Sequence, residues 1–354
     1  MTVARKHIVD VNATPYYLVT NRCVRRAFLC GIDHYSGNNY EHRRQLIVDL
    51  MFKYASLFAL DVCGYCVMSN HYHLVIRLDP DSAVSWSTHE VLTRWCGSYK
   101  GHPLVQRYLL GDALSPQELH AVNELSETYR KRLCDLSWFM AKLNETIARQ
   151  ANKEDDCRGR FWEGRYDARA LLDDAALITA MMYVDLNPIR AGMATTLEGS
   201  DYTSVQQRVL ALAKNKQKTS PANSPRNPSK TNRPATGYGL LPFLESESAT
   251  TTRDKQIGIP MRLTDYLQLI DWTGRSVRAD KRGAIPADVA GILNKLAINN
   301  ELWIDSVTQV EKKFGYVLGS SQLLDRFRKK LCKQWLQGKR VIQAFYRAQP
   351  VATT

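Results

Sequence analysis

The chain has 354 residues, of which 44% are hydrophobic, so it can build packed cores over two domains and is not disordered throughout. No apolar run approaches the about 20 residues that a membrane span needs, and the first residues lack the apolar segment of a secretion signal. The sequence therefore predicts a cytoplasmic protein without membrane contact, and its eight cysteines are expected to be free thiols.

The net charge of +13 is unevenly distributed. Residues 1–212 hold 24 basic and 24 acidic residues. Residues 213–240 hold 6 basic residues and no acidic ones, and residues 241–354 hold 18 basic and 11 acidic residues. These parts contribute 0, +6 and +7. Such a basic balance suits a nucleic-acid partner, and the alternative is a solubilising tail.

The first predicted elements are strand, helix, strand and strand. Residues 16–23 (YYLVTNRC) are typical of a strand, and 60–68 and 71–78 predict two strands around Ser69-Asn70. Between them, apolar residues recur at helical spacing: Leu46, Leu50, Tyr54 and Leu57. This order predicts an α+β fold with an antiparallel sheet.

Two cysteines in the second of these strands, Cys63 and Cys66, form a C-x-x-C pair. A structural zinc site would need a second pair at suitable spacing, which the other cysteines do not offer. Two buried small side chains are favoured over metal or redox chemistry.

Helical patterns follow. Ser115, Pro116 and Glu118 form a capping box, and 127–153 predicts one long amphipathic helix. A last helix over 173–193 is expected to end near Pro188.

The segment 213–240 is rich in Pro, Ser, Asn and basic residues, which predicts a disordered basic linker. Residues 241–354 then show helical periodicity and predict a basic helical domain. The chain is thus divided into an N-terminal domain over 1–212, the linker, and this C-terminal domain.

Two histidines interrupt the apolar strand 71–78. His71 and His73 are two residues apart and share one face of the strand, while Tyr72 faces the other way. Two adjacent imidazoles can chelate one divalent cation if a third ligand comes from elsewhere. The alternative is a pair of polar residues on the solvent face of an edge strand.

A phenol and an amide are paired in the last helix of the N-terminal domain. Tyr183 and Asn187 are four residues apart and share a helix face. Tyr183 can project towards a bound phosphate, and the Asn187 amide oxygen can bind the metal. The alternative is a core tyrosine followed by an end-capping asparagine.

The segment 159–169 (GRFWEGRYDAR) interleaves basic and aromatic residues, a composition that suits stacking on unpaired bases and contact with phosphates. The expected DNA contacts in it are Arg160, Trp162, Arg165, Tyr166 and Arg169. The alternative is a surface loop whose aromatic residues fill the core. Arg22 and Arg190 are further phosphate candidates, or members of surface salt bridges.

Four segments in order, YYLVTNRC, VMSNHYHLVI, GRFWEGRYDARAL and YVDLNPIRAG, resemble the REP-associated tyrosine transposases, which belong to the single-tyrosine HUH transposases of bacterial insertion sequences. The resemblance covers residues 8 to 210. Residues 81–135 are longer than in compact members of the family and are interpreted as a helical insertion. It implies a ferredoxin-like core with the two histidines on a central strand. It also implies Mg²⁺ or Mn²⁺ bound by His71, His73 and Asn187, with Tyr183 as the nucleophile.

The family cuts single-stranded DNA near imperfect hairpins and retains the 5′ phosphate on tyrosine. The resemblance therefore implies such DNA as the partner of a monomer or homodimer at the nucleoid. Two alternatives remain. One is a metal-dependent nuclease that uses water as the nucleophile, and the other is a domesticated protein that binds nucleic acid without mobilising it.

Overall fold

A five-stranded sheet with the order β2-β3-β1-β4-β5 forms the centre of the computed structural model. The structure describes residues 5–24, 29–33, 37–218, 239–244, 257–278, 285–331 and 336–346. The strands are β1 (Tyr16–Arg22), β2 (Leu60–Val67), β3 (His71–Leu78), β4 (Asp167–Leu171) and β5 (Val317–Leu318). The first four pair antiparallel, and β5 pairs parallel with β4. The predicted α+β class is confirmed.

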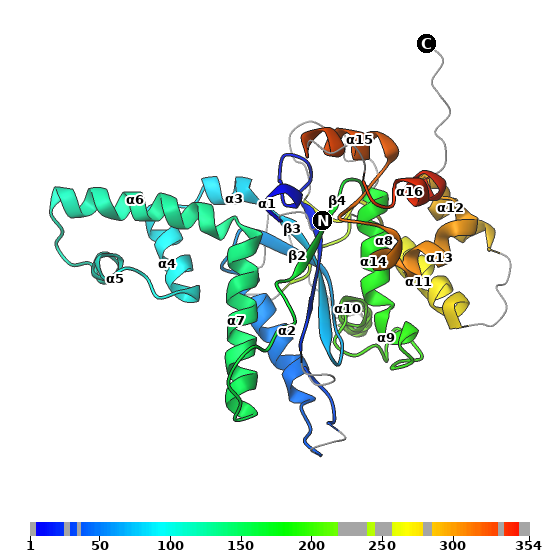
Figure 1. Ribbon diagram of the computed structural model, residues 1–354, viewed down its shortest axis with the longest axis horizontal. Helices are drawn as coiled ribbons and strands as arrows, with labels where there is room; N and C mark the ends of the chain where they lie inside the picture. The colour runs from blue at the N-terminus through cyan, green and yellow to red at the C-terminus, as the bar shows by residue number, and fades with distance from the viewer. Residues whose placement is uncertain are drawn as a thin grey trace, which may run out of the picture.

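Helices cover both faces of the sheet (Figure 1). On one face lie α2 (His42–Ala55) and α7 (Leu136–Glu154). On the other lies α8 (Asp174–Asp185), which starts at an Asp173 carboxylate that accepts a hydrogen bond from the Ala176 amide at 2.9 Å. Residues 175–185 of α8 are all buried, as expected for a helix that is apolar around its whole circumference and packed on every side.

The register of the inner strands brings polar residues together under α8. Thr20 of β1 is paired with His73 of β3, and Arg22 is paired with His71. Paired residues of antiparallel strands point to the same face. The chain therefore gathers these four side chains on one face of the sheet.

The predicted insertion forms a helical arm between β3 and α7, which projects away from the sheet in Figure 1. Its helices are α3 (Pro80–Val84), α4 (Thr88–Ser98), α5 (Pro103–Leu110) and α6 (Pro116–Leu133). The capping box at Ser115 is confirmed. The prediction of one helix over 127–153 is wrong: the chain breaks before α7, where the Asp135 carboxylate caps the new helix by accepting from the Ser137 amide at 2.6 Å.

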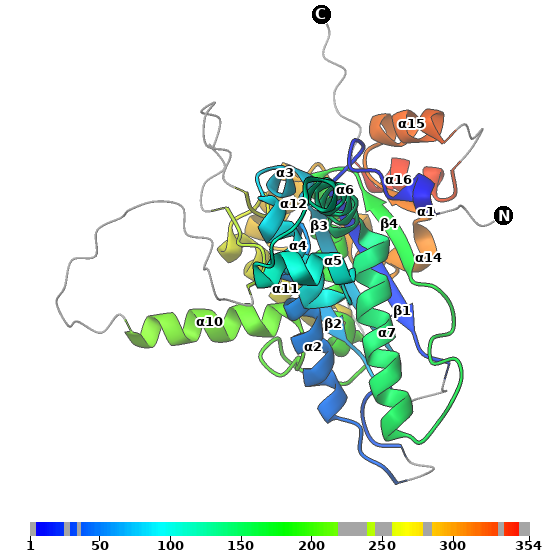
Figure 2. The same ribbon diagram turned by 90° about the vertical axis from the view of Figure 1, so that its left-hand side faces the viewer.

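The remaining helices mostly follow α8 in the chain. They are α1 (Arg5–Ile8), α9 (Asn187–Arg190), α10 (Ser204–Lys218), α11 (Leu263–Arg278), α12 (Ala287–Lys295), η1 (Asn300–Leu302), α13 (Trp303–Thr308), α14 (Val310–Lys313), α15 (Ser321–Lys330) and α16 (Lys339–Phe345). The predicted domain boundary at 212 falls inside α10, which Figure 2 shows extending from the body of the molecule. Most of the predicted linker, 219–238, lies outside the described residues.

Helices α13 and α14 lie against α8, α11 lies against α9, and β5 extends the sheet, so these C-terminal elements join the same body as the N-terminal ones (Figure 1). Independent folding of the two predicted domains stays a prediction. No helix in the described ranges combines the length and the apolar character needed to cross a membrane.

A buried carboxylate ties α8 to the C-terminal part. The Asp185 side chain accepts hydrogen bonds from the Ser204 hydroxyl at 2.5 Å, the Val205 amide at 3.0 Å and the Tyr266 hydroxyl at 2.6 Å. These donors come from α10 and α11. A buried acceptor with three partners fixes the helix that carries it, because leaving any partner out exposes an unsatisfied polar group. This network therefore holds the C-terminal end of α8 in place.

Candidate active site

His71 and His73 lie side by side beneath α8. Their ring centroids are 4.8 Å apart, and His73 is fully buried. Tyr72 points to the opposite face, where its hydroxyl donates to Asn144 Oδ1 at 2.5 Å, so the predicted division of faces is confirmed. The alternative of an edge strand is wrong, because β3 lies between β2 and β1.

The two imidazoles are held through their Nδ1 atoms. His73 Nδ1 lies 2.9 Å from the Thr20 hydroxyl oxygen, and His71 Nδ1 lies 2.5 Å from Asn70 Oδ1. His73 Nε2 is buried and has no hydrogen-bond partner among the residues that the structure describes. A buried polar atom without a partner is costly and indicates a site for an ion or ligand.

Both imidazoles are neutral at pH 7. Burial is the main cause that lowers the pKa of His71 to about 4 and that of His73 to about 3. The positive charges of Arg22 and Arg190 contribute at His71, and Arg169 and Arg190 at His73. A neutral imidazole retains a lone pair on one nitrogen, which is the state that binds a metal ion.

Tyr183 projects from α8 onto this pair. Its ring meets the His73 ring edge to face with centroids 5.4 Å apart, and the Arg190 guanidinium lies 4.7 Å from its centroid. Burial raises the pKa of Tyr183 to about 12, and the Glu311 charge acts in the same direction while Arg190 opposes it. The phenol is therefore protonated at neutral pH and needs help to become a nucleophile.

Asn187 follows Tyr183 by four residues, just past the end of α8. Helix α8 ends at Asp185, earlier than predicted, and Asn187 begins the short helix α9 with Pro188 in its first turn. Asn187 is 7% exposed, and its Nδ2 atom is buried without a hydrogen-bond partner in the described ranges. Rotating the amide by 180° would place its carbonyl oxygen at this position, as metal ligation requires.

The structure adds two polar residues that the sequence did not indicate, Thr20 and Glu311. The Thr20 hydroxyl donates to Glu311 Oε1 at 2.6 Å. The same carboxylate oxygen lies 3.5 Å from His73 Nδ1 and 3.7 Å from an Arg169 nitrogen. Glu311 belongs to α14 and precedes two lysines, a pattern typical of a solvated helix face, so nothing in the sequence marked it as a site residue.

The predicted aromatic DNA contacts are core residues in this structure. Trp162 is 9% exposed, and its indole donates to the Asn144 carbonyl oxygen at 2.9 Å. Tyr166 is 6% exposed, and its hydroxyl lies 3.1 Å from that of Ser137. Their faces are covered, so the alternative of aromatic residues that fill the core describes their placement. Base stacking by either ring would require the segment to rearrange.

The predicted arginine contacts fall into two groups. Arg22, Arg160 and Arg165 are exposed, and Arg160 donates to the Trp162 carbonyl oxygen at 2.8 Å within its own loop. Arg169 and Arg190 instead lie next to Glu311 and Tyr183. These two bring positive charge to the candidate site. DNA contact by all five stays a prediction.

No group of three or more His, Cys, Asp or Glu side chains in the described part of the chain is arranged to hold a metal ion. The histidine pair would thus need a ligand of another type, and the sequence predicts Asn187 for this part. Cys63 and Cys66 are buried free thiols, as predicted.

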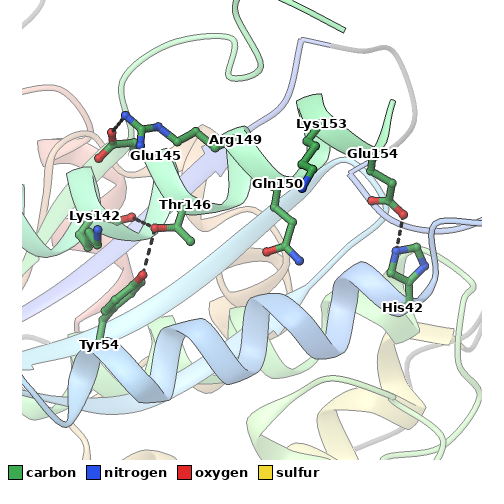
Figure 3. Close-up of a pocket in the computed structure, with 9 residues that line it drawn as sticks. All are labelled: His42, Tyr54, Lys142, Glu145, Thr146, Arg149, Gln150, Lys153 and Glu154. Atoms are coloured by element: carbon green, nitrogen blue, oxygen red, sulfur yellow. Dashed lines mark hydrogen bonds and ion pairs between the residues drawn. The ribbon is translucent and has the colours of Figure 1, made fainter. Parts of the chain in front are cut away.

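A surface groove on the opposite side of the sheet lies between α2 and α7 (Figure 3). Two of its acidic residues have contacts with basic ones: Glu145 lies 2.6 Å from Arg149, and Glu154 lies 2.5 Å from His42 Nε2. Tyr54 and Thr146 share a hydrogen bond of 3.0 Å. The groove contains none of the predicted site residues and offers no cluster for catalysis.

Tyr72→Phe tests the assignment of faces. We expect the DNA cleavage that the resemblance implies to be unchanged, and a loss of about 1 kcal/mol in the free energy of unfolding, the value typical of one hydrogen bond. The effect stays small because Asn144 Oδ1 still accepts from Asn21 at 2.9 Å. Urea unfolding and single-turnover cleavage measure the two quantities. A well-folded Tyr72→Phe variant without cleavage would contradict the assignment.

The chain has one distant structural relative among the proteins compared with it. The chain matches no protein-family model and no curated protein. Among solved structures, it is similar to a REP-associated tyrosine transposase bound to a REP hairpin, with 11% identity and a TM-score of 0.36 over 59% of this chain and 86% of that chain. A similarity this low carries no argument about fold or activity.

Proposed function

We propose that this chain is a metal-dependent, single-tyrosine DNA endonuclease and transposase of the HUH class. Its substrate would be single-stranded DNA next to an imperfect hairpin, and Tyr183 would form a 5′-phosphotyrosine intermediate. The observation that carries the proposal is the contact of Tyr183 with His73, one of the two neighbouring imidazoles. The Tyr183 ring contacts His73, whose Nε2 atom is buried without a partner in the described residues.

The residues present fit a divalent cation. His71 and His73 are neutral, and Asn187 adds a buried amide from the helix next to Tyr183. We assign the three as ligands of Mg²⁺ or Mn²⁺. When bound, such an ion would polarise a phosphodiester and neutralise charge on its non-bridging oxygen.

The chain's own residues supply the other parts of the reaction. The Tyr183 oxygen attacks phosphorus and forms the P–O(Tyr) bond, while the bond from phosphorus to the 3′ oxygen breaks. The phenol proton leaves to solvent, and the departing 3′ oxygen takes up a proton to become a 3′-hydroxyl. Arg190 lies over the Tyr183 ring, where its charge favours the phenolate and stabilises negative charge in the transition state. The phosphotyrosine bond retains the energy for rejoining by another 3′-hydroxyl.

We also propose that the core is ferredoxin-like. The order β1, α2, β2, β3, α7, β4 supports this, since α2 and α7 cover one face and the strands lie in the order β2-β3-β1-β4. In such a core the second face carries the site, beneath α8. The helical arm over α3–α6 and the C-terminal helices would be additions to it.

The test is the covalent product. We expect the full chain, incubated with Mn²⁺ and single-stranded hairpin DNA labelled at its 3′ end, to retain the label on a denaturing gel. Mass spectrometry of the digested adduct should place the nucleotide on the peptide that contains Tyr183. An adduct on another residue, or cleavage without an adduct, would contradict the proposal.

A further inference from the structure

We infer that Glu311 is a positioning residue for the metal site: through the Thr20 hydroxyl, it holds His73 in the tautomer that directs the Nε2 lone pair towards the cation. This inference rests on the proposed function of the histidine pair. The inference adds a residue of the C-terminal part to a site whose predicted residues all lie within 1–212. The three residues come from β1, β3 and α14.

The direction of each hydrogen bond follows from a count of protons. The Thr20 hydroxyl has one proton, and it lies 2.6 Å from Glu311 Oε1, which as a carboxylate oxygen can only accept. Thr20 therefore donates to Glu311. Its oxygen lies 2.9 Å from His73 Nδ1 and, with its proton committed, acts there as an acceptor. His73 must then carry its proton on Nδ1.

This tautomer leaves the lone pair on Nε2. That atom is the one that is buried without a hydrogen-bond partner in the described part of the chain. A neutral imidazole in the other tautomer would bury an unpaired N–H there and could not bind a cation through Nε2. The hydrogen bonds from His73 through Thr20 to Glu311 thus leave the Nε2 lone pair free for ligation. Carboxylates behind metal-binding histidines have this effect in general.

Glu311 is held as a carboxylate by its surroundings. The Thr20 hydroxyl donates to its Oε1 atom at 2.6 Å, and an Arg169 nitrogen lies 3.7 Å from the same oxygen, and both contacts favour the charged form. Glu311 lies on the Nδ1 side of the ring, 3.5 Å from that nitrogen, which separates its role from direct ligation through Nε2.

The experiment measures tautomer and metal affinity in the full chain. Long-range ¹H–¹⁵N spectra of histidine-labelled protein, with His73 assigned by its loss in His73→Gln, should show a protonated Nδ1 in the metal-free wild type. Thr20→Val and Glu311→Ala should populate the Nε2-protonated form. Their affinity for Mn²⁺, measured by electron paramagnetic resonance, should fall by about 10- to 100-fold.

One conservative variant and one control separate positioning from structure. Thr20→Ser keeps the hydroxyl and should restore both tautomer and affinity. Glu301→Gln removes an exposed carboxylate of the same C-terminal part and should leave both unchanged. An Nε2-protonated His73 in the wild type would overturn the inference, as would Glu311→Ala that binds Mn²⁺ as tightly as the wild type. If the wild type bound no Mn²⁺, the proposed function would fail, and the tautomer alone would decide the role of Glu311.

Discussion

Tyr183→Phe is expected to abolish the covalent DNA adduct and to lower cleavage of single-stranded hairpin DNA by about 10³-fold or more, since it removes the attacking atom itself. The change deletes only the hydroxyl oxygen. The ring keeps its edge-to-face contact with His73 at 5.4 Å and its place beneath Arg190 at 4.7 Å. DNA binding and folding should therefore survive. Adduct formation on a denaturing gel and binding by fluorescence anisotropy measure the two effects.

Tyr166→Phe is the matched control, because it removes a different phenol, that of the segment 159–169. The Tyr166 hydroxyl lies 3.1 Å from that of Ser137 in the core, so its loss should leave the adduct intact. If Tyr183→Phe still cut the DNA and released a free 5′ phosphate, the attacking group would be water. The hydrolytic nuclease would then be the better account.

The local patterns predicted much of the fold. Alternation over 71–78 placed Tyr72 opposite the two histidines, and the structure confirms this division. The capping box at Ser115 also formed as predicted. Both features depend on neighbours within a few residues, which is why sequence alone suffices for them.

Features that depend on distant neighbours were missed or misplaced. The stripe expected on α2 included Leu46 and Leu50, whereas the helix buries Ile47 and Met51 more completely. The helix is packed between the sheet and α7, so its most buried face is set by partners that periodicity does not reveal. Strand β5 is two residues long and is identified by its pairing with β4.

The site itself was predictable in part. His71, His73, Tyr183 and Asn187 are marked by spacing, and the resemblance linked the two motifs. Glu311 is 291 residues from Thr20 in the chain, and no local signal joins them. The predicted domain boundary at 212 also hid Glu311 from the prediction, because this boundary assigned the C-terminal residues to a separate domain. Only the packing of α13 and α14 on α8 brings that carboxylate to His73.

Replacing either histidine is expected to remove cleavage. His71→Ala and His73→Gln should each lower the cleavage rate by about 10²- to 10⁴-fold, since a cation that polarises a phosphodiester contributes several kcal/mol and each 1.4 kcal/mol is tenfold in rate. EDTA should have the same effect on the wild type, and added Mn²⁺ should restore only the wild type. Single-turnover cleavage at saturating DNA is the measurement.

His42→Ala is the control for losing an imidazole. His42 is exposed on α2 and pairs with Glu154 in the groove of Figure 3, on the other side of the sheet from the candidate site. Cleavage should stay at the wild-type rate in this variant.

His73 is fully buried, so circular dichroism must first show that His73→Gln folds. His71 is partly exposed, and its replacement by alanine leaves a smaller defect in the core. Undiminished cleavage in EDTA, or in a folded His71→Ala variant, would remove the metal from the mechanism. Tyr183 and Arg190 would then have to act on the phosphodiester without it.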